Sequence, residues 1–489
     1  MAKIIFIIQR EEISSKRSVL PKVLFPIETA LTASLLALSN HKVTSFDLNL
    51  IGKNEDWTKK FKKLLKDFNP GFVISAPQSL TFLIKESIQE TADTFFHAKQ
   101  YNPAIKTIYC GQFATSYPKK ALKKSTADYI IRGEYDEAIR NLINTIEKGT
   151  VPLDIIGVMG KNSTKTTPIA CSHIFKELPF PAYDEFNFKQ YFQFPGKGNV
   201  RYAEHSHKYT HYLTSRGCTA RCCFCNVSYL RGGRKYQIRP VETVLDDLER
   251  LTCEFGIEEI HFLDENMTMN PKRTIAICDG IVKRKICFKW IASGGMSIYS
   301  LNERLLQKLK TSGCYRLNLA IESGSQTVLK HLIHKPINLS KAMDVLSIAK
   351  RLDFEIIGFF IIGLPEETKE QIDKTLKLAA SSHFDYVTFS IATPQAGTAF
   401  EKSCIEKGFL KADQSLESIS KRSTGTFSTN EFTSFDLEKI RWKSWDKINF
   451  TTHKKREVIC KMMGITNKEL SSIREQTALQ FHSRWPQNQ

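Results

Sequence analysis

The sequence Thr214-Ser-Arg-Gly-Cys-Thr-Ala-Arg-Cys-Cys-Phe-Cys225 gathers four of the twelve cysteines of the chain into one short stretch. Cys218, Cys222 and Cys225 follow the spacing Cys-x3-Cys-x2-Cys. Three thiolates at this spacing can hold three corners of a four-iron cluster. The fourth iron would then lack a protein ligand and stay open to a substrate or cofactor. The stretch therefore predicts a [4Fe-4S] cluster with one open position.

Zinc is the main alternative metal, because closely spaced cysteines also suit a structural zinc ion. Such a site needs a fourth ligand, which His205, His207 or His211 could supply. A zinc ribbon also requires a second Cys-x2-Cys pair, and the sequence contains none. We therefore favour the iron–sulfur cluster and interpret Cys223 as a bystander thiol.

The sequence around and after the cysteines alternates apolar strands with amphipathic helices over residues 206–410. Six such units predict an α/β domain, a partial (β/α)6 barrel of the TIM type. Barrel enzymes carry their chemistry at the carboxyl ends of the strands, and the cysteines follow the first strand directly. Residues 411–489 predict a charged helical region. The expected strands are Tyr212–Arg216, Glu259–Leu263, Phe288–Ala292, Arg316–Ile321, Glu355–Ile361 and Tyr386–Ile391.

Residues 1–150 also alternate strands with helices, which predicts a doubly wound, Rossmann-like parallel sheet. Ligands of such sheets bind beyond the carboxyl ends of the strands. Small or polar residues stand at those ends and are the candidate contacts there: Ser75, Gly111, Gly133 and Glu134. Residues 151–205 are rich in Gly, Ser, Thr and Pro and predict a linker. The expected strands are Lys3–Ile8, Lys42–Phe46, Gly71–Ser75, Ile105–Cys110 and Tyr129–Arg132.

The chain carries a net charge of +19, from 70 Lys and Arg against 51 Asp and Glu. These basic residues are spread along the whole chain, so we interpret most of them as solvated surface. The exception is Arg441–Lys461, where Trp442 and Trp445 are interleaved with cations. An RNA-binding protein with a structural cluster is one alternative; we favour a helix that packs its aromatics on the barrel. With no apolar run long enough to span a membrane, we expect a cytoplasmic protein.

The cysteine motif, in this position, resembles that of the radical S-adenosylmethionine (SAM) superfamily, and Phe224 matches the aromatic residue that often precedes its last ligand. Ala320-Ile-Glu-Ser-Gly-Ser-Gln326 resembles the fourth-strand segment of that family, which implies that Glu322 and Ser323 contact the methionine or ribose part of SAM. Gly358-Phe-Phe-Ile-Ile-Gly-Leu-Pro-Glu-Glu-Thr368 resembles the fifth-strand motif, which implies that the backbone near Gly358 and Gly363 lies along the adenine. Where many members have Gly-Gly-Glu for the amino group of SAM, this chain has Asp264-Glu-Asn, with Asp264 as the candidate.

The N-terminal domain resembles that of the branch that binds cobalamin. The matching stretches include Cys110-Gly-Gln-Phe-Ala-Thr115, Asp128-Tyr-Ile-Ile-Arg-Gly-Glu134 and Leu178-Pro-Phe-Pro-Ala182. The resemblance implies three cofactors: the [4Fe-4S] cluster, SAM and cobalamin. It also implies methylation of an unactivated carbon in a small molecule, lipid or peptide, with an electron donor such as flavodoxin or ferredoxin. A radical rearrangement or oxidative cyclisation is the alternative reaction, and no general acid or base is assigned.

A methylthiotransferase acting on tRNA has a similar layout but needs three N-terminal cysteines for a second cluster. Only Cys110 and Cys171 precede Cys218 here, which argues against that class. Only Cys404 and Cys460 follow the expected barrel, so clusters in the C-terminal region are not expected either. Nucleic acid is therefore not an expected partner.

Overall fold

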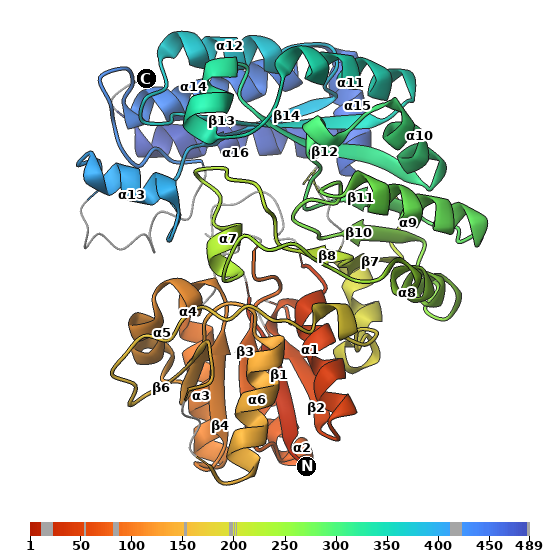
Figure 1. Ribbon diagram of the computed structural model, residues 1–489. Helices are drawn as coiled ribbons and strands as arrows, with labels where there is room; N and C mark the ends of the chain where they lie inside the picture. The colour runs from red at the N-terminus through yellow and green to blue at the C-terminus, as the bar shows by residue number, and fades with distance from the viewer. Residues whose placement is uncertain are drawn as a thin grey trace.

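The computed structural model describes residues 1–489 except 11–22, 53–54, 82–87, 151–153, 195–198, 200, 202, 411–422 and 487–489. Its two large sheets belong to two α/β units that meet around helix α7 (Figure 1). The first sheet has the order β2-β1-β3-β4-β5-β6, in which the first five strands are parallel. These strands are β1 (Lys3–Ile8), β2 (Lys42–Asp47), β3 (Phe72–Ala76), β4 (Lys106–Cys110) and β5 (Tyr129–Ile131).

Helices cover both faces of this sheet, and strand β1 is apolar on both sides. Ile4, Phe6 and Ile8 of β1 pack in the same core cluster as one pair of helices, whereas Ile5 and Ile7 pack with the helices of the other face. The doubly wound sheet predicted from the sequence is thus confirmed. The first pair is α1 (Ile27–Leu38) and α6 (Asp136–Glu147); the other face carries α2 (Trp57–Phe68), α3 (Ile88–Tyr101), α4 (Gln112–Ser116) and α5 (Pro118–Ser125).

The sheet extends further along the chain than we predicted. Strand β6 (Val158–Gly160) pairs antiparallel with β5, although its residues fall in the expected linker. Other described residues of the linker are packed: Ala182 N donates to Ala30 O at 3.1 Å, and Phe180 lies under the guanidinium of Arg250 at 4.2 Å. These residues join α1 to the second unit through backbone and side-chain contacts.

The second unit is the predicted partial barrel, with six parallel strands in the order β7-β10-β11-β12-β13-β14. These are β7 (Tyr209–Tyr212), β10 (Glu259–Phe262), β11 (Lys289–Ala292), β12 (Cys314–Glu322), β13 (Glu355–Ile362) and β14 (Tyr386–Ile391). The intervening helices are α8 (Val241–Cys253), α9 (Pro271–Lys283), α10 (Glu303–Thr311), α11 (Leu339–Arg351) and α12 (Lys369–Ala379).

The first barrel strand differs from the prediction of Tyr212–Arg216, because β7 begins at Tyr209 and ends at Tyr212. The Asp264 carboxylate accepts hydrogen bonds from both the backbone N and the hydroxyl of Thr214, at 3.1 and 2.6 Å. These bonds draw the chain away from the sheet. It continues as β8 (Ser215–Arg216), which pairs with β9 (Gln237–Ile238) in a two-stranded ribbon.

The described part of the C-terminal region, residues 423–486, is mainly helical, as predicted, and covers the open edge of the barrel; residues 411–422 of the prediction lie outside the described residues. Asn449 binds both the backbone N and O of Val387 in β14, at 2.8 and 2.9 Å. Trp445 Nε1 donates to the hydroxyl of Tyr386 at 2.7 Å, and Trp442 stacks on Phe481. Trp445 therefore packs on the barrel, as we expected, whereas Trp442 packs against another residue of the C-terminal region. The helices are α13 (Ala399–Glu406), α14 (Ser434–Asn449), α15 (His453–Met463) and α16 (Asn467–Arg484).

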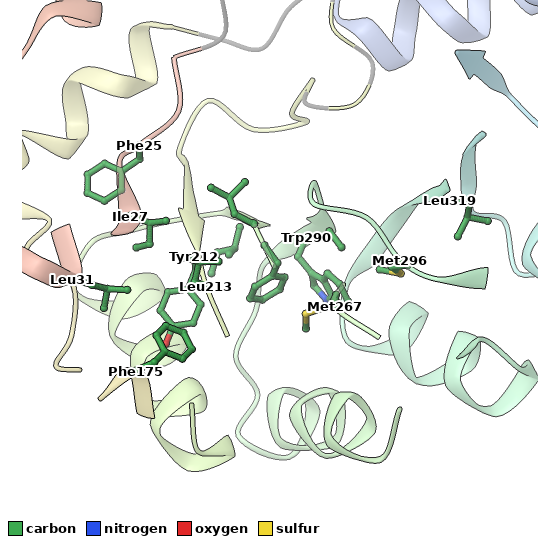
Figure 2. Packing of buried hydrophobic residues seen from close by; sticks show 14 of the residues in the cluster. Phe25, Ile27, Leu31, Phe175, Tyr212, Leu213, Met267, Trp290, Met296 and Leu319 are labelled. Atoms are coloured by element: carbon green, nitrogen blue, oxygen red, sulfur yellow. The ribbon is translucent and has the colours of Figure 1, made fainter. Parts of the chain in front are cut away.

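One apolar core runs through both units. Phe25 stacks on Tyr183 of the linker with ring centroids 4.6 Å apart, and the hydroxyl of Tyr183 donates to His211 O in β7. Figure 2 shows this cluster continuing from the α1 side through Tyr212 to Trp290. The two units consequently do not have separate interiors. None of the helices in the described part of the chain is both long and apolar enough to cross a membrane.

Candidate functional site

The cysteine loop lies just beyond the carboxyl end of β7, between β8 and α7 (Val227–Leu230). Its backbone is tied to the barrel rim at Cys223, whose N donates to Ile333 O and whose O accepts from Phe400 N, both at 3.0 Å. Phe224 packs its ring against the core. The loop therefore sits between the two units, next to α7 in Figure 1.

The three predicted ligands are half-buried thiols on one loop, and none of them forms a disulfide. Burial, with a contribution from the next thiol in the series, raises the pKa of both Cys218 and Cys222 to about 11. A bound metal would therefore be needed to hold them as thiolates. Burial raises the pKa of Cys223 to about 12, and Cys404 is among its neighbours. The chemistry of these three donors fits a cluster held by cysteines, although within the described residues no group of three or more His, Cys, Asp or Glu side chains is gathered closely enough to hold a metal ion.

The histidines considered as zinc ligands do not lie at the cysteine loop. His205 pairs with Glu355 at 3.3 Å and stacks on Tyr315 with centroids 4.0 Å apart. His211 Nδ1 accepts a hydrogen bond from Phe25 N at 3.1 Å. His207 precedes β7 and so lies at the opposite end of that strand from the cysteines. The geometry does not support the zinc interpretation.

A buried ion pair lies beside the cysteine loop at the carboxyl end of β12. Lys335 Nζ donates to Glu322 Oε1 at 2.7 Å and to Ala320 O at 2.8 Å. Burial alone would lower the pKa of Lys335, but the charges of Glu322 and Cys222 outweigh it, so the pKa of Lys335 is raised. Glu322 has a φ of +72°, a conformation that costs energy for a residue with a side chain and that recurs at functional sites. Glu322 is predicted from the sequence as a SAM contact, and in the structure its carboxylate is paired with Lys335.

The other residues predicted to contact SAM are turned in different directions. The hydroxyl of Ser323 bonds to Thr375 of α12 at 3.0 Å, away from the loop. A Cβ on Gly358 would meet the rings of Phe384 and Phe360, on the helical side of the sheet. Gly363 has a φ of +86° and lets the chain pass under α14 as it leaves β13. Their predicted roles therefore rest on the backbone rather than on side chains.

Asp264 and Glu265 follow β10, and both side chains accept hydrogen bonds from the segment that leads into the cysteine loop. Both oxygens of Asp264 are taken up by Thr214, and the hydroxyl of Ser215 also donates to it. Glu265 Oε2 accepts from Gly217 N at 2.9 Å. The structure thus gives Asp264 a different task from the predicted amino-group contact: it shapes the entrance to the cysteine loop.

At the predicted ligand edge of the first sheet, Gln9 connects Ser75 with the residue before Gly111. Gln9, just after β1, donates through Nε2 to the hydroxyl of Ser75 at 3.1 Å and to Cys110 O at 2.9 Å. Gly111 follows Cys110 and is the N-cap residue of α4. Gln9 Oε1 is buried and has no hydrogen-bond partner within the described residues. A buried amide oxygen without a partner is costly, and a ligand at this edge would satisfy it.

The end of β5 is occupied by the protein itself. Gly133 forms an isolated bridge with Ala170, and its N donates to the hydroxyl of Thr115. Glu134 is buried and accepts hydrogen bonds from Ser172 N at 2.8 Å and from Arg231 at 3.2 Å. The predicted roles of Gly133 and Glu134 in letting a ligand approach do not match this packing, because both residues lie against the linker and the second unit.

The carboxyl edges of the two sheets face each other across the cysteine loop. The hydroxyl of Thr81, beyond β3, donates to Glu265 beyond β10 at 2.9 Å. Arg231, at the end of α7, reaches Glu28, Glu134 and Glu265 together. Sequence patterns could not reveal Arg231, because its partners lie between 34 and 203 positions away along the chain.

Comparison with known proteins agrees with this arrangement. The family model described as the radical SAM superfamily matches residues 212–379. An uncharacterized methyltransferase from Pyrococcus horikoshii is 30% identical over 391 residues, which is 79% of this chain and 79% of the relative. A cytidylyl-2-hydroxyethylphosphonate methyltransferase from Streptomyces wedmorensis is 28% identical over 388 residues, 72% of this chain and 70% of the relative.

The solved structure of the radical SAM methyltransferase TsrM from Kitasatospora setae, with cobalamin and a [4Fe-4S] cluster bound, shares the fold. Its TM-score is 0.72 at 14% identity, and the match covers 99% of both chains. The likeness therefore includes the N-terminal sheet, the barrel and the C-terminal helices. With its cysteine loop, its barrel and a relative similar over most of its length, this chain belongs to the radical SAM superfamily.

Proposed function

We propose that this protein is a cobalamin-dependent radical SAM methyltransferase that methylates an unactivated carbon of a small molecule, lipid or peptide. The observation that carries the proposal is the apposition of two ligand-binding edges. The end of β3 and the end of β10 are in direct contact through Thr81 and Glu265, and the cysteine loop lies at this junction. Open α/β sheets and barrels both bind ligands at such carboxyl ends.

The second support is the set of relatives and neighbours. Both relatives described above are named methyltransferases, and TsrM is a radical SAM methyltransferase solved with cobalamin and a cluster. When bound, a reduced cluster supplies the electron that splits SAM into methionine and a 5′-deoxyadenosyl radical, while cobalamin supplies a carrier for the methyl group. A flavodoxin or ferredoxin is the kind of donor that this chemistry requires.

In this proposal, the residues of the chain bind and orient the cofactors. Cys218, Cys222 and Cys225 hold three irons. Glu322 contacts SAM. Lys335 pairs with the Glu322 carboxylate, so that this buried negative charge has a partner beside the cluster. The chain also excludes water, since the Lys335–Glu322 pair is less than a tenth exposed.

The N-terminal edge holds cobalamin in this proposal. Gln9 offers a fixed amide oxygen there, because its amide nitrogen is already held by Ser75 and Cys110. Gly111 leaves the adjacent backbone without a side chain. No histidine stands in the Asp-x-His-x-x-Gly spacing that other cobalamin proteins use, so axial ligation of cobalt by the chain is not part of the proposal.

The test is anaerobic. The full chain is reconstituted with iron and sulfide, given hydroxocobalamin and a reductant, and its SAM products are followed by mass spectrometry. We expect 5′-deoxyadenosine, S-adenosylhomocysteine that depends on cobalamin, and loss of both products in Cys222→Ala. Cys223→Ser is the matched control and should retain the iron content and both products.

The products also separate the competing reactions. 5′-Deoxyadenosine without cobalamin-dependent S-adenosylhomocysteine would leave a radical enzyme and would favour rearrangement or cyclisation. A verified cluster that forms no 5′-deoxyadenosine with any reductant would contradict the proposal as a whole.

A further inference from the structure

The cysteine loop is fastened to the N-terminal unit by an arginine near each of its ends. Arg216 comes two residues before Cys218, and its Nη1 lies 3.1 Å from Asp136 Oδ1, at the start of α6. Its guanidinium also lies 4.5 Å over the ring of Phe175. Arg231 comes six residues after Cys225, at the end of α7. Both arginine side chains are only 2% exposed.

Arg231 is the centre of a buried ionic cluster that spans three elements. Its guanidinium reaches Glu28 of α1 at 2.9 Å, Glu134 beyond β5 at 3.2 Å and Glu265 beyond β10 at 2.7 Å. Each of these carboxylates is at most 5% exposed. Burial would lower the pKa of Arg231, but the three carboxylates outweigh it and raise the pKa. The cation is therefore fixed in the interface.

The partners of this cluster are themselves held in place. Glu134 accepts from Ser172 N and from the side-chain amide of Gln237 in β9. Glu265 accepts from Gly217 N, one residue before the first cysteine. The base of the loop and the carboxyl ends of both sheets are thus joined through one guanidinium, whose planar fork suits several carboxylates in a way that an ammonium does not.

We infer that Arg231, supported by Arg216, is a positioning residue that fixes the distance and orientation of the cluster relative to the cobalamin edge. The inference rests on the proposed function and deepens it. A methyl group can leave the sulfonium of SAM, with its bonding pair remaining on sulfur as S-adenosylhomocysteine, only if the acceptor stands in line behind it. Cleavage to 5′-deoxyadenosine needs only the cluster, one electron and SAM. Weakening the contacts of Arg231 should therefore impair methyl transfer from SAM much more than cleavage of SAM to 5′-deoxyadenosine.

The primary variant is Arg231→Lys, which keeps the charge but cannot reach three carboxylates at once. In the reconstituted full chain with hydroxocobalamin, SAM and reductant, we expect cobalamin-dependent S-adenosylhomocysteine to fall by about 10- to 100-fold, as a displacement near 1 Å does to an oriented reaction. 5′-Deoxyadenosine should change by less than about 3-fold, because that chemistry stays within the barrel.

The matched control is Arg284→Lys. Arg284 also meets three carboxylates, those of Glu242, Asp246 and Glu249, but it does so on the outer surface between α8 and α9. It should leave both products unchanged. A second variant combines Arg231→Gln with Glu28→Gln and Glu134→Gln, so that two buried carboxylates are not left without their cation. It should show the same selective loss.

A spectroscopic distance separates positioning from a merely structural role. Pulsed electron paramagnetic resonance between the reduced cluster and cob(II)alamin should give one narrow distance in the unaltered protein and in Arg284→Lys. The distribution should be shifted or broadened in both Arg231 variants. An unchanged distance with an unchanged ratio of products would overturn the inference, as would an equal loss of both products with loss of iron in both Arg231 variants.

The inference and the proposed function can fail separately. The unaltered protein could make no cobalamin-dependent S-adenosylhomocysteine and still show a narrow cluster–cobalamin distance that broadens in Arg231→Lys. That result would contradict the proposed methyl transfer and support the positioning role of Arg231. If the unaltered protein retains no cobalamin at all, both are overturned.

Discussion

Gly133 is a residue whose replacement should damage the fold through the backbone alone. Its φ is +89°, and a Cβ built there would lie 2.3 Å from Ala170 O. Gly133→Ala should therefore combine conformational strain with a steric clash and lower the free energy of unfolding by about 3 kcal/mol. Gly149 has a φ of +70° but open space around it, so Gly149→Ala should cost only about 1 kcal/mol.

Urea denaturation of the two variants, monitored by circular dichroism, checks this difference. Equal losses would show that the linker moves aside at Ala170 and that the bridge with Gly133 is not rigid.

Glu367 should make stability depend on pH. Burial raises its pKa from an ordinary value near 4.5 to about 7, against the hydrogen bonds from Leu364 N and Gly363 N. Between these two pH values the folded chain holds a proton that the unfolded chain has released. Stability contributed by this site therefore falls as pH rises from about 4.5 to 7 and is constant outside that window.

Glu367→Gln removes that dependence. Relative to the unaltered protein, the variant should gain up to about 3 kcal/mol in the free energy of unfolding between pH 4 and pH 8, from a shift of about 2.5 pKa units. Glu370→Gln, at an exposed position in the first turn of α12, is the control and should show no such trend. Denaturation midpoints that stay parallel across this range for Glu367→Gln would contradict the assignment.

At the scale of elements, α14 acts as the cover of a sheet edge. β14 is the last strand of its sheet, and Asn449 binds the backbone N and O of Val387 as a neighbouring strand would. Asn449→Ala would leave both groups buried without partners. We expect a loss of about 2 to 4 kcal/mol in the free energy of unfolding, from two groups at about 1 to 2 kcal/mol each.

Lys443→Ala, on the exposed side of the same helix, is the control and should be near neutral. Hydrogen exchange at β14 should accelerate in Asn449→Ala only. If exchange there is unchanged, water or another side chain replaces the amide.

Elements with strong periodicity could be predicted from the sequence, and those shaped by distant contacts could not. β14 matches its predicted bounds, since Tyr386–Ile391 is apolar and β-branched with clear flanks. β7 ends earlier than predicted because Thr214 binds the Asp264 carboxylate, fifty positions away along the chain, instead of continuing the strand. β6 was missed because it is a three-residue edge strand within a polar linker.

The residues of the candidate site fall into the same two groups, those predicted from local sequence and those whose contacts depend on the fold. Cys218, Cys222 and Cys225 are predicted as cluster ligands from local spacing, and Glu322 as a SAM contact from a resemblance over a short segment; these roles stay predictions. The contacts of Glu134 and Asp264 could not be predicted from the sequence, because a sequence does not say whether a carboxylate faces a ligand or a buried partner within the protein. The role of Arg231 could not be predicted from the sequence, because its carboxylate partners come from distant parts of the chain.

At the scale of the whole molecule, the shared core predicts one cooperative unit rather than two independent domains. Phe25 lies where α1, the linker and the barrel meet, and it contacts Tyr183, Phe186 and Tyr191. Phe61 is equally buried, but it belongs to the cluster on the other face of the first sheet. The two residues thus compare a side chain at the seam with one inside a single unit.

Each of Phe25→Ala and Phe61→Ala should lower the free energy of unfolding by about 3 to 5 kcal/mol. Their patterns of hydrogen exchange should differ. Phe25→Ala should raise exchange in α1, in the linker and in β7, because a cavity at the seam weakens both units at once. Phe61→Ala should raise it in α2 and its neighbours and leave the barrel protected. If Phe25→Ala instead affects only the first unit, or if calorimetry of the unaltered chain shows two separate transitions, the units fold independently. The fixed relation between the two sheet edges would then have to come from the ionic cluster at Arg231 alone.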